Sequence, residues 1–133
     1  MDISASAHAA ALWAGLHMVL LLVLSVLVVR QRRLHRVELG HGDIPSLNLA
    51  VRAFGNATEY VPAGMASLAV LAVVGAAPMV VHVAGLTLFL GRIAHAVGLS
   101  RSGAASLPRA IGVVVTWLAY IFCAVALIFN AIA

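Results

Sequence analysis

The sequence predicts an all-α integral membrane protein, a left-handed up-down bundle of four membrane-spanning helices. Its 133 residues are 64% hydrophobic and only 9% charged, whereas a soluble domain carries roughly 25% charged residues. The mean hydropathy of +1.12 agrees with a membrane location. Polar or turn-forming residues divide the sequence into four apolar stretches. Each stretch is long enough to cross a bilayer as a helix, which takes about 20 residues.

The first predicted span covers about residues 8–29 and ends at the basic run Arg30-Gln31-Arg32-Arg33. A secretory signal peptide carries its positive charges before a shorter apolar run, so we expect this stretch to be retained as a helix. A polar loop follows from Leu34 to Ser46. Asp43 and Ser46 are the candidate caps where this loop enters the next helix.

The remaining three spans are delimited by a tight turn and by a longer loop. The second covers about residues 47–75, and Ala76-Ala77-Pro78 turns the chain into the third, about residues 79–98. The fourth covers about residues 108–132 and begins at Pro108, a residue that a first helical turn accepts. The second span is longer than a membrane requires, so its first turns are expected to protrude. The whole of residues 1–133 forms one predicted domain.

The arginines are distributed unevenly between the two ends of the predicted bundle. The first loop carries Arg30, Arg32, Arg33 and Arg36. Arg101 and Arg109 flank the third loop, whereas the second turn and both termini carry no Lys or Arg. The positive-inside rule therefore predicts cytoplasmic basic loops and termini that face outward, into a periplasm or a lumen. Trp13, near the outer end of the first span, is expected to anchor the helix at the membrane interface.

Polar residues interrupt the second and third spans at matching positions. Arg52, Asn56 and Glu59 are spaced i, i+4 and i+7, which places them on one helical face. The third span carries Arg92 and His95. Ionisable groups in a membrane helix are costly, so they have partners and often mark a functional site.

Distances from the tight turn predict which of these residues are level with one another. At 1.5 Å per residue, Glu59 and Arg92 lie roughly 24 and 22 Å from the turn, and Asn56 and His95 roughly 28 and 27 Å. We therefore expect a Glu59–Arg92 pair, with Asn56 beside His95 and Arg52 above them. A structural pair that locks two helices explains Glu59 and Arg92. It does not require the additional arginines, which favour an anion pocket.

Other classes of site find little support. Cys123 is the single cysteine, so an intrachain disulfide and a cysteine-based metal site are both excluded. The histidines lack metal-ligand spacing, and no metal is expected. The arginines line a membrane rim without interleaved aromatic residues, which argues against binding of nucleic acid.

Two motifs together resemble those of a known family. They are Arg-x-x-x-Asn-x-x-Glu-Tyr-x-Pro at residues 52–62 and Gly-Arg-Ile-Ala-His-Ala at residues 91–96. The sequence is similar to the MAPEG family (membrane-associated proteins in eicosanoid and glutathione metabolism), most of all to its small bacterial members. The resemblance implies a homotrimer surrounded by the lipids of a bacterial inner membrane, with periplasmic termini. It also implies glutathione as co-substrate, bound at the cytoplasmic side between neighbouring subunits.

The resemblance also implies roles for individual residues. Glutathione contacts would come from Arg52, Asn56, Glu59, Tyr60, Arg92 and His95, together with Arg30 or Arg32 from the end of the first span. Arg109 matches the arginine that stabilises the thiolate. These roles agree with general chemistry, because arginine binds carboxylates in bidentate geometry and a nearby cation lowers the pKa of a thiol from about 8.5.

One position departs from the family pattern. Many catalytic members carry a tyrosine seven residues after the third-span arginine, where this chain has Leu99. Three functions stay open. The first is a glutathione-dependent enzyme that conjugates glutathione to a lipophilic small-molecule electrophile or reduces lipid hydroperoxides. The second is a non-catalytic protein of the same fold that binds an anionic lipid or metabolite. The third, an ion or proton pathway past Glu59 and His95, needs polar groups at more depths than the sequence provides.

Overall fold

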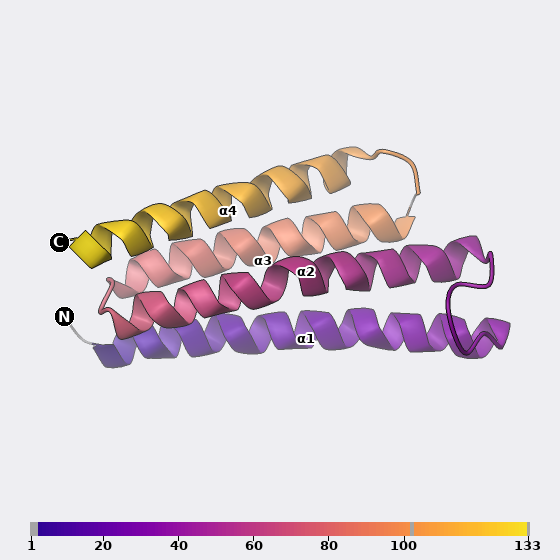
Figure 1. The fold of residues 1–133 in the computed structure, drawn as a ribbon, viewed down its shortest axis with the longest axis horizontal. Helices are drawn as coiled ribbons and strands as arrows, with labels where there is room; N and C mark the ends of the chain where they lie inside the picture. Colours follow the sequence, from indigo (N-terminus) through magenta and orange to yellow (C-terminus); the bar gives the residue numbers. More distant parts are fainter. Residues whose placement is uncertain (1–2, 102, 133) are drawn as a thin grey trace.

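The computed structural model describes residues 3–101 and 103–132, which form four long antiparallel helices (Figure 1). They are α1 (Ile3–His35), α2 (Pro45–Val73), α3 (Pro78–Arg101) and α4 (Leu107–Ile132). The α1–α2 and α3–α4 loops lie at one end of the bundle, which we call the basic end because it carries Arg32, Arg33 and Arg101. The α2–α3 turn and the outer ends of α1 and α4 lie at the other. The predicted up-down architecture is confirmed.

The helices extend slightly further than the predicted spans at the basic end. The apolar sequence of α1 ends before Arg30, but the helix continues to His35, where Arg36 adopts a positive φ of 56°. Basic side chains near a helix C-terminus interact favourably with the helix dipole, so these arginines support the last turn instead of ending the helix.

The start of α2 differs from the sequence prediction. Ile44 is the N-cap residue and makes no side-chain capping bond, and Pro45 occupies the first turn. Asp43 has a φ of 55°, and the Ser46 hydroxyl lies 3.3 Å from Nε2 of His35. Neither predicted cap is therefore used. Proline is favourable in the first turn without a capping side chain, because it has no backbone N–H that requires a partner and its φ is already helical.

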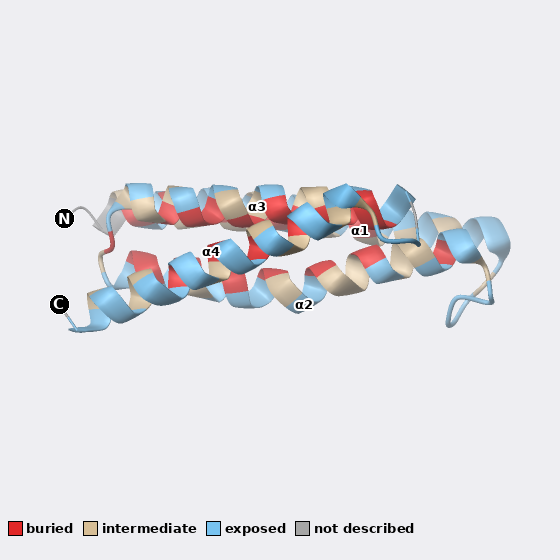
Figure 2. Cartoon of the chain, turned by 90° about the horizontal axis from the view of Figure 1, so that it is seen from above, coloured by how far each residue is buried: buried red, intermediate tan, exposed pale blue. Residues whose placement is uncertain are grey.

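Three of the described helices are long and apolar enough to cross a membrane, namely α1, α3 and α4. The exception is α2, whose first half carries Arg52, Asn56 and Glu59. It nevertheless packs along both α1 and α3. In addition, α1 packs on α3 and α4 packs on α3 and α2, whereas the described backbones of α1 and α4 do not lie directly against each other. Among the described helices, α2 and α3 therefore form the centre, and much of the apolar surface of α1 and α4 is exposed (Figure 2).

Buried side chains form two apolar clusters with polar groups between them. One cluster lies toward the α2–α3 turn and contains Trp13, Leu71 and Val81. The other lies toward the basic end around Leu24, Ala57 and Leu99. The fully buried His17 and Arg92 fall between these two clusters along α1 and α3, and Thr116 of α4 is fully buried as well.

Trp13 does not anchor the bundle at the membrane interface as predicted. It is 8% exposed and packs inside the bundle, where its indole N–H donates to Nδ1 of His82 at 3.2 Å. Gly85 makes room for its ring, since a Cβ added there would lie 2.2 Å from the indole. The indole N–H thus has its hydrogen-bond partner on α3, so burying Trp13 inside the bundle does not leave this donor unsatisfied.

Candidate functional site

A polar pocket of about 230 Å³ opens near the basic end between α2, α3 and α4. It is lined by Val51, Arg52, Gly55, Asn56, Glu59, His95, Leu99 and Arg109. Five of these residues were predicted as site residues from the sequence alone. The pocket joins the α2 motif, the α3 motif and the start of α4, which are far apart in the sequence. We call it the polar pocket.

The charges around the polar pocket are predominantly positive. Arg52 and Arg109 contribute two guanidinium groups, whereas Glu59 is the single carboxylate among the described residues that line it. Glu59 is exposed, and its Oε2 accepts a hydrogen bond of 3.4 Å from the Asn56 amide. An anionic ligand that also carries one cationic group would therefore match the pocket.

Arg92 lies buried beside the pocket and holds Asn56 in place. Its side chain is 2% exposed, and its Nη1 donates to Oδ1 of Asn56 at 2.7 Å. Its Nε donates to the Thr116 hydroxyl at 3.0 Å. Its guanidinium carbon lies 4.8 Å from the centroid of the Tyr60 ring, which is cation–π geometry. Arg92 thus connects α3 with both α2 and α4.

The predicted Glu59–Arg92 ion pair is wrong. Among the described residues, the polar contacts of Arg92 go to Asn56, Thr116 and Tyr60, and the carboxylate of Glu59 contacts Asn56 instead. Arg92 packs on the ring of Tyr60, the chain neighbour of Glu59, which agrees with the similar height expected for Glu59 and Arg92. The height of a residue along a helix does not determine in which direction its side chain points around the helix axis. Glu59 faces outward, whereas Asn56 faces α3.

His95 reaches the pocket because α3 and α4 approach one another at glycines. A Cβ added to Gly112 would lie 2.3 Å from the backbone nitrogen of His95 and 2.7 Å from the Gly91 carbonyl oxygen. A Cβ on Gly98 would lie 2.5 Å from the backbone nitrogen of Arg109. Small residues allow membrane helices to pack this closely. The glycines therefore set the positions of both His95 and Arg109.

Arg109 lines two different cavities. It belongs to the polar pocket, and it also lines an apolar groove of about 440 Å³ on the outer side of α4. Val113, Val114 and Trp117 line that groove as well. A guanidinium at this boundary faces a polar compartment on one side and an apolar surface on the other.

Four predicted site residues do not line the polar pocket: Arg92, which lies beside it, and Arg30, Arg32 and Tyr60. Arg30 is exposed on α1, and the Nη1 of Arg32 donates to the backbone oxygen of Glu38 at 3.0 Å. Both lie on the helix that does not border the pocket. Tyr60 instead packs on Arg92, and its backbone oxygen accepts a hydrogen bond from the Tyr120 hydroxyl. The Tyr60 and Tyr120 rings pack edge to face, with their centroids 5.8 Å apart.

The sequence analysis missed Thr116 and assigned no polar role to Tyr120. Thr116 accepts from Nε of Arg92 and donates to the Gly112 carbonyl oxygen at 2.7 Å, so it gives this nitrogen of the buried arginine a partner at the α3–α4 contact. A usable signal was present, because Thr116 follows Arg109 by seven residues and so lies on the same face of the helix.

Comparison with known proteins identifies the family. The sequence profile of the MAPEG family matches residues 10–129 of the chain. The chain belongs to the MAPEG family. It is 39% identical over 88 residues to "Inner membrane protein YecN" of Escherichia coli (strain K12), which covers 66% of this chain and 67% of the relative. The protein of the same name from Escherichia coli O6:H1 (strain CFT073) matches with the same identity and coverage.

Membership of the MAPEG family agrees with the architecture of the bundle. With its apolar helices and a relative named as an inner membrane protein, this MAPEG protein is an integral membrane protein. The match spans all four helices, including both motifs that line or support the polar pocket.

Proposed function

We propose that this MAPEG protein is a glutathione-dependent membrane enzyme. It conjugates glutathione to lipophilic electrophiles or reduces lipid hydroperoxides. The observation that carries the proposal is the position of Arg109, which lines both the polar pocket and the apolar groove along α4. A reaction between a charged thiol and a lipid-soluble molecule requires such a boundary.

The polar pocket offers the groups that glutathione requires. Glutathione carries two carboxylates and one ammonium group. Arg52 and Arg109 would contact carboxylate or thiolate groups, for which guanidinium geometry is well suited. The exposed carboxylate of Glu59 would take the ammonium, and the Asn56 amide and His95 imidazole would add hydrogen bonds. Arg92 is a positioning residue, since it holds Asn56 through its Nη1.

The chemistry starts from the thiolate form of glutathione. An ordinary thiol has a pKa of about 8.5, and the guanidinium of Arg109 would favour the thiolate by electrostatic attraction. In conjugation, the sulfur attacks an electrophilic carbon and the leaving group departs with its electron pair. In peroxide reduction, the sulfur attacks oxygen, an alcohol departs, and a second glutathione converts the sulfenic acid into a disulfide and water.

The assembly and orientation are part of the proposal. A homotrimer would bring Arg30 or Arg32 of a neighbouring subunit toward the polar pocket, which these residues do not reach within one chain. The exposed face of α2 carries the small residues Ala63 and Ala66, which permit close helix contact. The basic end would face the cytoplasm of a bacterium, with both termini in the periplasm.

A second function, anion binding without catalysis, is favoured by one specific observation. Leu99 lines the polar pocket at the position where many catalytic relatives carry a tyrosine. A leucine supplies no hydrogen bond to a ligand. The same pocket would then bind an anionic lipid or metabolite through Arg52 and Arg109.

Ligand selectivity separates the two functions. The purified protein is titrated with glutathione, with S-methyl glutathione and with glutathione disulfide, and binding is followed by calorimetry. An enzyme that activates the thiol binds glutathione more tightly than the S-methyl form, and Arg52→Ala abolishes binding while Arg33→Ala does not. Equal affinity for all three ligands would support the non-catalytic function. Binding of none of them would contradict the glutathione-dependent enzyme and leave a lipid or another anionic metabolite as the ligand of the pocket.

A further inference from the structure

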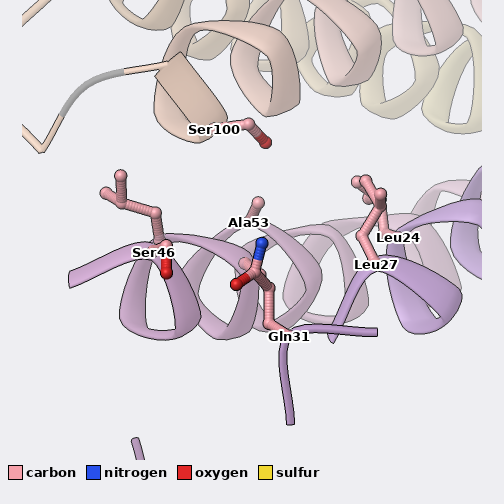
Figure 3. Close-up of a pocket in the computed structure, with 8 residues that line it drawn as sticks. Leu24, Leu27, Gln31, Ser46, Ala53 and Ser100 are labelled. Carbon is pink, nitrogen blue, oxygen red and sulfur yellow. The ribbon is translucent and has the colours of Figure 1, made fainter. Parts of the chain in front are cut away.

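A second cavity lies on the opposite side of the bundle from the polar pocket. It measures about 220 Å³ and is enclosed by α1, α2 and the end of α3. Figure 3 shows Ser100 facing the space into which Leu24, Gln31 and Ala53 project from α1 and α2. None of the residues that line this cavity lines the polar pocket, so the two sites are separate.

This cavity continues into a groove on the outer surface of the bundle. The groove measures about 290 Å³ and shares Leu24, Leu27 and Ser100 with the cavity. Its walls are apolar along two helices: Leu20, Val23 and Leu27 on α1, and Ile93, Ala96 and Val97 on α3. Several of these side chains are exposed, including Val23 at 49% and Val97 at 38%. In a membrane protein, such a groove faces lipid chains.

The end of the groove nearest the loops is polar and positively charged. Ser100 and Arg101 line it at the last turn of α3. On α1, Arg30 follows Leu27 by three residues, which places it one turn beyond the apolar wall. Gln31 adds a buried acceptor, since its Oε1 has no hydrogen-bond partner among the described residues. A buried polar atom without a partner is costly, and a bound group that donates a hydrogen bond removes this cost.

We propose that the groove between α1 and α3 binds an anionic phospholipid of the surrounding bilayer. One acyl chain lies along the apolar walls, and the phosphate contacts Arg101 at the membrane surface. A hydroxyl or ammonium group of the headgroup donates to Oε1 of Gln31 in the adjoining cavity. The charge and the free acceptor together select a headgroup that is anionic and also carries a donor, such as phosphoglycerol.

Lipid retention measured by native mass spectrometry tests the proposal on the intact protein. The protein is exchanged into a neutral detergent and titrated with phosphatidylglycerol, phosphatidic acid and phosphatidylcholine of equal chain length. We expect affinity to fall in that order, because phosphatidic acid lacks the headgroup hydroxyls and phosphatidylcholine has neither net charge nor donor. Equal retention of all three would show ordinary boundary lipid and would overturn the proposal.

Three variants test where on the protein the lipid binds. Arg101→Gln is expected to weaken phosphatidylglycerol retention about tenfold, the effect of losing one charge-assisted hydrogen bond. Arg36→Gln removes the same charge from the first loop and is expected to leave retention nearly unchanged. Gln31→Leu removes the acceptor and should abolish the preference for phosphatidylglycerol over phosphatidic acid. Equal losses in Arg101→Gln and Arg36→Gln would mean that the lipid responds only to net charge, which would contradict the site.

A groove-filling variant provides an independent check. Val97→Trp occupies the groove from an exposed position on α3 and is expected to reduce lipid retention, whereas Val125→Trp on α4 is not. If Val97→Trp changes the oligomeric state and leaves lipid retention intact, the groove is a contact between copies of this chain and the proposal is wrong. Arg101 does not line the polar pocket, so glutathione binding by Arg101→Gln should equal that of the unmodified protein.

Discussion

Nη1 of Arg92 lies 2.7 Å from the side-chain oxygen of Asn56, and this contact joins α3 to α2 beside the polar pocket. The arginine is buried, yet its partners are neutral groups and an aromatic ring. The carboxylate of Glu59 is not bound by Arg92; it accepts from Asn56 and lines the pocket. A pair that serves only to hold two helices together would have used that carboxylate.

The first prediction concerns Asn56 and Glu59. Asn56→Ala removes the acceptor for a buried guanidinium, so it should lower the free energy of unfolding by about 1–3 kcal/mol. Glu59→Ala removes an exposed carboxylate that accepts one long hydrogen bond, from Asn56 at 3.4 Å. This variant should therefore leave stability almost unchanged. Thermal unfolding in detergent measures both. A larger loss in Glu59→Ala than in Asn56→Ala would restore the ion pair that the sequence suggested.

The second prediction concerns the close contact between α3 and α4. Gly112→Ala places a methyl group 2.3 Å from the backbone of His95, so the helices must separate. We expect a loss of about 1–3 kcal/mol of stability together with weaker glutathione binding. Gly15→Ala is the matched control, because nothing lies within 4 Å of the added Cβ on exposed α1.

The control variant should have the opposite effect on stability. Alanine in place of a helical glycine stabilises by roughly 0.5–1 kcal/mol, so Gly15→Ala should raise the unfolding temperature. If Gly112→Ala has the same unfolding temperature and the same glutathione affinity as the unmodified protein, the glycine contact does not position His95.

The third prediction concerns Leu99, which lines the polar pocket and is 5% exposed. Leu99→Tyr introduces the hydroxyl that many relatives carry, and one new hydrogen bond should improve glutathione affinity about tenfold. Leu99→Phe is the matched control, since it adds the ring without the hydroxyl. Calorimetry compares the two variants. Equal affinities would mean that no group at this position reaches the ligand.

Much of the fold followed from the sequence because apolar stretches and turn residues determine where membrane helices begin and end. Counting residues from the short α2–α3 turn also placed Asn56 level with His95, and both line one pocket. The same count could not decide between Asn56 and Glu59 as the partner of Arg92. That choice depends on how α2 is rotated about its axis, and α2 has polar residues on more than one face.

Other features depend on contacts between α4 and its neighbours, which sequence spacing does not reveal. Gly112 and Thr116 become informative once α4 is placed against Gly91 and Arg92 of α3. Trp13 was assigned to the membrane interface from its place in α1, but the space above Gly85 accommodates it inside the bundle. In each case the deciding residue lies on a different helix.

Ultraviolet absorbance of the thiolate tests most directly whether Arg109 stabilises the thiolate of bound glutathione. Glutathione is titrated into the purified protein at neutral pH, with Arg109→Ala and the control Arg33→Ala measured alongside. We predict a saturable thiolate signal in the unmodified protein and in Arg33→Ala, and its loss in Arg109→Ala. A signal of equal size in Arg109→Ala, or binding of glutathione without any thiolate signal, would contradict the role of Arg109.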